Sequence, residues 1–164
     1  MTLALNEQQF IQKVNDLRKS GTVDLSLEED LSIAIMNLVS LEEHFFFTAE
    51  KTKKEEYFDL LSRVREMRKS LLARMIEVTE GETWCISKHL LAASMRLMEV
   101  GTKLQGEKKK SEAKEMFDKA YELYSLFWML RLKLVSTSEL KTERNDGPRT
   151  EEDLINKLLD CCKE

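Results

Sequence analysis

Residues 108–136 read KKKSEAKEMFDKAYELYSLFWMLRLKLVS, and this stretch decides the fold class of the chain. Apolar side chains return every three or four residues along it, which is the period of an α-helix. The stripe consists of Ala113, Phe117, Ala120, Tyr124, Phe127 and Leu134, and it is widened by Met116, Leu123 and Leu130. A face this broad predicts a long helix that is the most buried helix of the protein.

The same period recurs in three earlier segments of similar length. It predicts helices over residues 27–50, 53–79 and 82–105. Each is preceded by a capping pair, in which a Ser or Thr stands three residues before a Glu; the pairs are Ser26 with Glu29, Thr52 with Glu55 and Thr79 with Glu82. Because only a few residues separate the helices, consecutive helices must turn back on one another. The sequence therefore predicts an all-α single domain, an antiparallel up-down-up-down four-helix bundle.

Shorter helices are expected at both ends of this bundle. Residues 6–19 show a helical period and precede Gly21, which predicts a short first helix. Residues 137–149 are mostly polar and read as a linker. The segment 151–163 predicts a C-terminal helix that packs on the bundle or on a partner through Leu154, Leu158 and Leu159.

The composition excludes several classes of protein. A chain of 164 residues with 42% hydrophobic and 34% charged residues can bury a core, so we expect a folded domain. Its 5 glycines and 1 proline are too few for the many turns of a β-rich fold. A net charge of -4 gives no broad positive surface for phosphate backbones, so we expect no nucleic-acid partner.

The same reading predicts a cytoplasmic protein. No apolar run approaches the length of about 18 residues that a membrane span needs, so we expect no membrane partner. Three cysteines, Cys85, Cys161 and Cys162, are an odd number, and two of them are adjacent. This pattern does not suit a disulfide framework, and we expect reduced thiols and no cofactor.

Polar side chains that interrupt the apolar stripes are the candidate site residues, because helical bundles build their sites from such groups. At about 1.5 Å of rise per residue, Glu42 and Arg96 lie about 20 Å from the end where the first long helix begins, and Arg68 and Tyr124 about 15–20 Å from it. We expect these four side chains to share one layer. Arg131 interrupts the last long helix in the same way.

Two interpretations of this layer are open. It is either a structural ion-pair network or a site for a small anionic ligand held by a guanidinium group. The network is the favoured interpretation, because charges inside a bundle usually pair with one another.

Cys85 and His89 stand four residues apart on one predicted helix, so they share a face and belong to the candidate ligand site. The other histidine, His44, is expected about 15 Å away along the bundle. Zinc–nitrogen bonds are about 2 Å long, so we expect no metal centre. A thiol nucleophile is disfavoured as well, because no third group is evident that would orient His89 as its base.

Aromatic residues exceed what one helical seam needs. Phe45, Phe46 and Phe47 point to more than one side of the first long helix, and Trp84 and Trp128 add further apolar area. The terminal helices or a partner must cover part of this surface.

The favoured function is therefore a non-catalytic helical interaction module that binds a protein partner or self-associates as a homo-oligomer. The alternative is a bundle or enzyme for a small anionic ligand. In that reading Arg68 and Arg96 clamp the anion, Glu42 and Tyr124 orient it, and His89 transfers protons.

Overall fold

The computed structural model describes residues 11–12, 15–16, 19–21, 24–78 and 81–134. Within these ranges the chain forms four long α-helices and no strand, which confirms the all-α prediction. The helices are α2 (Leu25–Thr52), α3 (Glu56–Leu72), α4 (Glu82–Gly106) and α5 (Lys110–Arg131). The predicted helix 6–19 lies mostly outside the described residues, and the predicted linker 137–149 and helix 151–163 lie entirely outside them.

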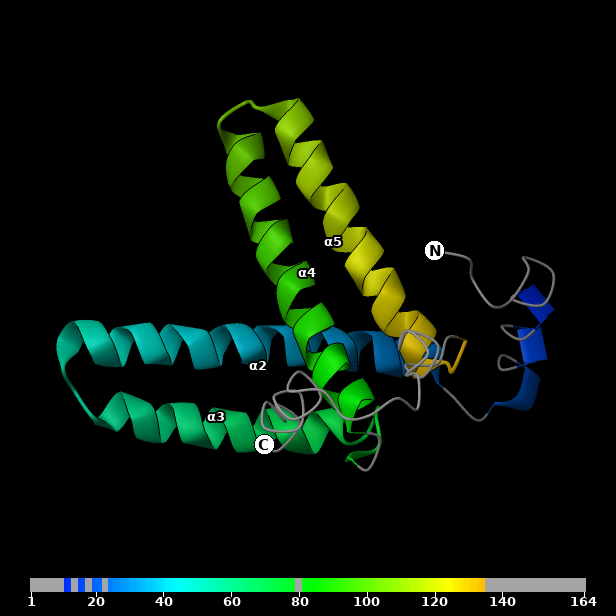
Figure 1. Cartoon of the computed structure of the whole chain (residues 1–164), viewed down its shortest axis with the longest axis horizontal. Helices are drawn as coiled ribbons and strands as arrows, with labels where there is room; N and C mark the ends of the chain where they lie inside the picture. Colours follow the sequence, from blue (N-terminus) through cyan, green and yellow to red (C-terminus); the bar gives the residue numbers. More distant parts are fainter. Residues whose placement is uncertain (1–10, 13–14, 17–18, 22–23, 79–80, 135–164) are drawn as a thin grey trace, which may run out of the picture.

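The four helices form two hairpins that cross (Figure 1). Helices α2 and α3 lie side by side, as do α4 and α5, and the second hairpin crosses α2 at a steep angle. The close helix pairs are α2 with α3, α4 with α5, and α2 with α4. These contacts suit a helical bundle, but the helices do not all run alongside one another as the sequence analysis expected.

The connection between the two hairpins explains this difference. We expected the second long helix to continue to residue 79, but α3 ends at Leu72 and α4 begins at Glu82. Met75 and Ile76 lie in this connection with 5% and 3% of their surface exposed, so they add to the core without being part of either helix. A connection of this length does not force α4 back along α3, whereas the short turns within each hairpin do.

The predicted helix starts also differ from the structure. Helix α2 begins before Ser26, and its N-cap is Asp24, whose carboxylate accepts a 3.1 Å hydrogen bond from the Leu27 amide. Thr52 is the last residue of α2 and caps no helix. Asp24 directly precedes Leu25 and is as good a cap as Ser or Thr, but it does not belong to the Ser or Thr pairs from which the helix starts were predicted.

The core lies where the two hairpins cross. Each helix contributes, and Ile35, Leu72, Leu91 and Phe127 are fully buried there. The Tyr124 ring stacks on Phe127 with centroids 6.2 Å apart. Away from the crossing each hairpin is only two helices thick, so large apolar side chains on the arms stay partly exposed.

Lysines occupy the left-handed backbone positions at which these helices end. Lys53, Lys108 and Lys133 have φ angles of 57°, 64° and 54°. Glycine is the usual residue at such positions because it has no Cβ to clash with the backbone. The protein therefore turns its chain here with few glycines, at a conformational cost.

Replacing Lys53 by glycine should raise the free energy of unfolding by about 0.5–1 kcal/mol. A left-handed conformation costs a residue with a side chain about 1–2 kcal/mol, and the freedom of glycine in the unfolded chain cancels part of that gain. Lys51→Gly, in the last turn of α2, should instead lower stability by about 0.5 kcal/mol. Urea unfolding of both variants checks the opposite signs, and a loss in both would contradict this account.

Candidate functional site

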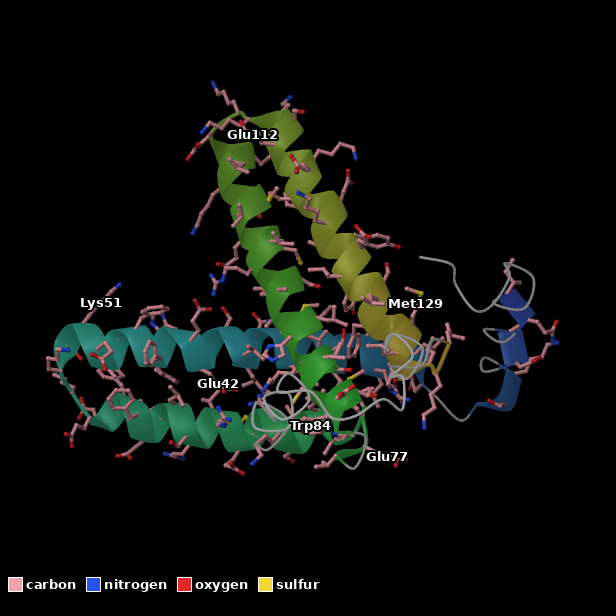
Figure 2. The ribbon with its side chains drawn as sticks, in the orientation of Figure 1. Glu42, Lys51, Glu77, Trp84, Glu112 and Met129 are labelled. Carbon is pink, nitrogen blue, oxygen red and sulfur yellow. The ribbon has the colours of Figure 1, made fainter. Side chains whose placement is uncertain are left out.

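Glu42 and Arg68 form a buried ion pair between α2 and α3. The Arg68 Nε donates to Glu42 Oε1 at 2.8 Å, and Nη2 lies 3.5 Å from Oε2. The side chain of Arg68 is 1% exposed and that of Glu42 is 13% exposed. Figure 2 labels Glu42 on the side of α2 that faces α3. The structure thus brings these two predicted residues together. The carboxylate of Glu42 compensates the positive charge of the Arg68 guanidinium group.

Arg96 lies elsewhere, at the surface between α2 and α4. Its side chain is 45% exposed and donates to Glu99 of its own helix at 2.6 Å. It also bonds to Glu43 of α2, and its Nη2 lies 3.4 Å from the Ser40 hydroxyl. Arg96 therefore links the two hairpins through the residue next to Glu42 and not through Glu42 itself.

Tyr124, like Arg96, lies apart from the pair of Glu42 and Arg68. Its hydroxyl lies 2.7 Å from the hydroxyl of Ser32, which is fully buried on α2. Ser32 precedes Glu42 by ten residues, which is about 15 Å along a helix. Tyr124 therefore belongs to the core at the crossing.

The structure does not bring the four predicted residues Glu42, Arg68, Arg96 and Tyr124 together: Glu42 pairs with Arg68, Arg96 reaches α2 at the neighbouring Glu43, and Tyr124 lies apart at Ser32. The predicted position of Tyr124 assumed that all four helices share one axis, and they do not, because the hairpins cross at a steep angle (Figure 1). Arg131 has a partner that its sequence position did not indicate. Its Nη2 donates to Glu28 Oε1 at 2.5 Å between α5 and α2, and Glu28 had no distinguishing signal among the acidic residues of a helix start.

Cys85 and His89 share a helix but have different surroundings. Cys85 is 3% exposed and belongs to the core cluster. His89 lines a hollow between α2 and α4. Within the described part of the chain, no group of three or more His, Cys, Asp or Glu side chains is placed to hold a metal ion. Nor is any helix of that part long and apolar enough to cross a membrane.

The hollow beside His89 opens where α4 leaves α2. Its volume is about 460 Å³, and it is lined by Val39, Ser40 and Glu43 of α2 and by His89, Ala92, Ala93, Met95 and Arg96 of α4. The side chains of the two alanines are short, so they leave space in the hollow along α4. Charged groups stand at the rim, where Arg96 bonds to Glu43 and Glu99.

An aromatic pair continues the α2 wall of this hollow. Phe46 and Phe47 follow Glu43 by three and four residues, which places them one turn further along that side of the helix. They are 45% and 49% exposed, and their rings meet edge to face with centroids 5.2 Å apart. On α4, Val100 follows Arg96 by one turn and is 37% exposed. We call the hollow together with Phe46, Phe47 and Val100 the hairpin cleft.

Comparisons with protein-family models, curated proteins and solved structures found no match to this chain.

Proposed function

We propose that this protein is a non-catalytic helical interaction module, and that the hairpin cleft binds an amphipathic helix of a partner protein. One observation carries the proposal: two exposed phenylalanines adjoin a hollow whose walls belong to two different hairpins. Aromatic side chains bury large apolar areas at protein interfaces, and exposed pairs of them often mark a contact surface.

The shape and chemistry of the cleft suit a helix. Ala92 and Ala93 permit a close approach of a partner backbone along α4. Phe46 and Phe47 offer a wall against which leucine-type side chains can pack. The charged groups at the rim match the usual anatomy of an interface, in which an apolar centre is surrounded by polar groups. An amphipathic helix with apolar residues at every third or fourth position fits such a groove.

The other interpretation, a site for a small anionic ligand, has less support. It needs free guanidinium groups, but the Arg68 side chain is paired with Glu42, and Arg96 bonds to two carboxylates. Binding an anion at Arg68 would require breaking a largely buried pair, which is costly, and an anion at Arg96 would have to displace two carboxylates.

Three finer expectations belong to the same proposal. The predicted helices 6–19 and 151–163 pack against the crossed hairpins, within each of which the two helices run antiparallel. The protein acts in the cytoplasm. A second copy of the chain is the other partner class, in which case the partner helix comes from that copy.

The test is a selection of amphipathic helices from a display library against the full chain. The tightest selected helix is then titrated against Phe47→Glu and Met67→Glu. Both variants add one carboxylate at an exposed apolar position, since Phe47 is 49% and Met67 56% exposed. We expect Phe47→Glu to weaken binding by about tenfold or more, as loss of a central interface residue does, and Met67→Glu to leave it unchanged.

Two results would contradict the proposal. One is that every helix selected from the library binds Phe47→Glu as tightly as it binds the unchanged chain. The other is an equal loss of binding in Met67→Glu, which would place the contact outside the hairpin cleft.

A further inference from the structure

We propose that residues 151–163 of the same chain occupy the hairpin cleft and compete there with the partner helix. This inference rests on the proposed function, because it assigns a regulator to the same cleft. The described helices leave an apolar surface exposed at the cleft, and residues 151–163 are an apolar segment that would be stabilised by packing on such a surface.

The segment has the sequence expected of such an occupant. Leu154 and Leu158 are four residues apart, and Ile155 and Leu159 repeat that spacing beside them. In a helix these four side chains form one apolar face. Thr150 and Asp153 stand at the start of the segment, where such residues favour the beginning of a helix.

The chain is long enough to bring the segment to the cleft. The contact of Tyr124 with Ser32 fixes the position of α5 on α2. From there Leu134 lies about 15 Å along α5 and its end, and Val39 about 10 Å along α2, at about 1.5 Å per residue. Residues 135–150 can span about 50 Å when extended, at about 3.3 Å per residue. The connecting chain is therefore about twice as long as the path requires.

Tethering favours this occupant over a second copy. A linker of this length holds the segment near the cleft at an effective concentration of about 1 mM. Free copies at micromolar concentration compete poorly with that. A partner helix must displace the segment, so its apparent affinity is reduced in proportion to the fraction of molecules whose cleft is free.

A disulfide trap tests the placement in the full chain. Ser40→Cys puts a thiol in the wall of the cleft, within reach of the native Cys161 and Cys162 at the end of the segment. Met67→Cys puts a more exposed thiol on α3 as the control, since Met67 is exposed and Ser40 is partly buried. With oxidised glutathione as the oxidant, we expect Ser40→Cys to give a disulfide to Cys161 or Cys162 within one monomer. Mass spectrometry of tryptic peptides identifies the bond.

Substitutions within the segment make the test specific. In the Ser40→Cys background, Leu158→Asp removes the centre of the apolar face and should lower the yield of the disulfide by about tenfold or more. Asn156→Asp adds the same carboxylate beside that face and should leave the yield unchanged. An equal yield from Met67→Cys, a bond that joins two chains, or no effect of Leu158→Asp would overturn the inference.

A binding measurement separates this inference from the proposed function. If the segment occupies the cleft, the selected helix binds Leu158→Asp about tenfold more tightly than it binds the unchanged chain or Asn156→Asp. Equal affinity for all three would overturn the inference and leave the function standing. A helix that binds none of them at the cleft would overturn the function.

Discussion

Replacing Glu42 by alanine should lower the free energy of unfolding by about 3–5 kcal/mol, because it leaves the Arg68 charge buried without its carboxylate. Arg68 is 1% exposed, and its guanidinium group makes two contacts with Glu42. Arg65 also lies 3.9 Å from Glu42, but it is 42% exposed and keeps its hydration. Urea denaturation followed by circular dichroism measures the loss.

The neighbouring residue provides a matched control. Glu43→Ala removes the carboxylate that bonds to Arg96, but both partners are about half exposed. Pairs of that kind contribute about 0–1 kcal/mol, so this variant should stay close to the unchanged protein. The double variant Glu42→Leu with Arg68→Met should recover most of the lost stability, because it replaces the ion pair by apolar groups of similar size. Equal losses in Glu42→Ala and Glu43→Ala would contradict the assignment of a buried pair.

Replacing Phe127 by alanine should cost about 3–5 kcal/mol, the usual cost of deleting a buried aromatic ring from a core. Phe127 is fully buried where the hairpins cross and packs against both Tyr124 and Trp128. The matched variant Phe117→Ala removes the same ring from the arm of the second hairpin, where it is 38% exposed, and should cost about 1 kcal/mol. Thermal unfolding of the two variants compares them directly. Similar losses at both positions would show that stability is not concentrated at the crossing.

Much of the fold could be predicted because apolar periodicity is a local property. It gave the existence of all four long helices, and it gave the bounds of α2, α4 and α5 to within five residues. It failed at the end of α3, since Met75 and Ile76 continue the spacing that begins at Leu72. Spacing reports which side chains are buried, and these two are buried although the helix has ended.

The candidate site was harder to predict because it depends on how the hairpins cross. Glu42 meets Arg68 because both lie on the seam of one hairpin, where each interrupts the apolar stripe of its helix. Arg96 belongs to the other hairpin, so its partner is set by the crossing. That crossing follows from close packing between the hairpins, for example where the Tyr124 hydroxyl of α5 lies 2.7 Å from the buried Ser32 hydroxyl of α2. No pattern along one helix carries this information.

The central claim is that the hairpin cleft receives a helix, and nuclear magnetic resonance tests it most directly. The full chain, labelled with nitrogen-15, is titrated with the selected helix while the amide shifts are followed. The account predicts that the largest changes fall on residues 39–50 of α2 and 89–103 of α4, which form the two walls. Changes centred on residues 110–121 of α5, with those walls unaffected, would contradict it.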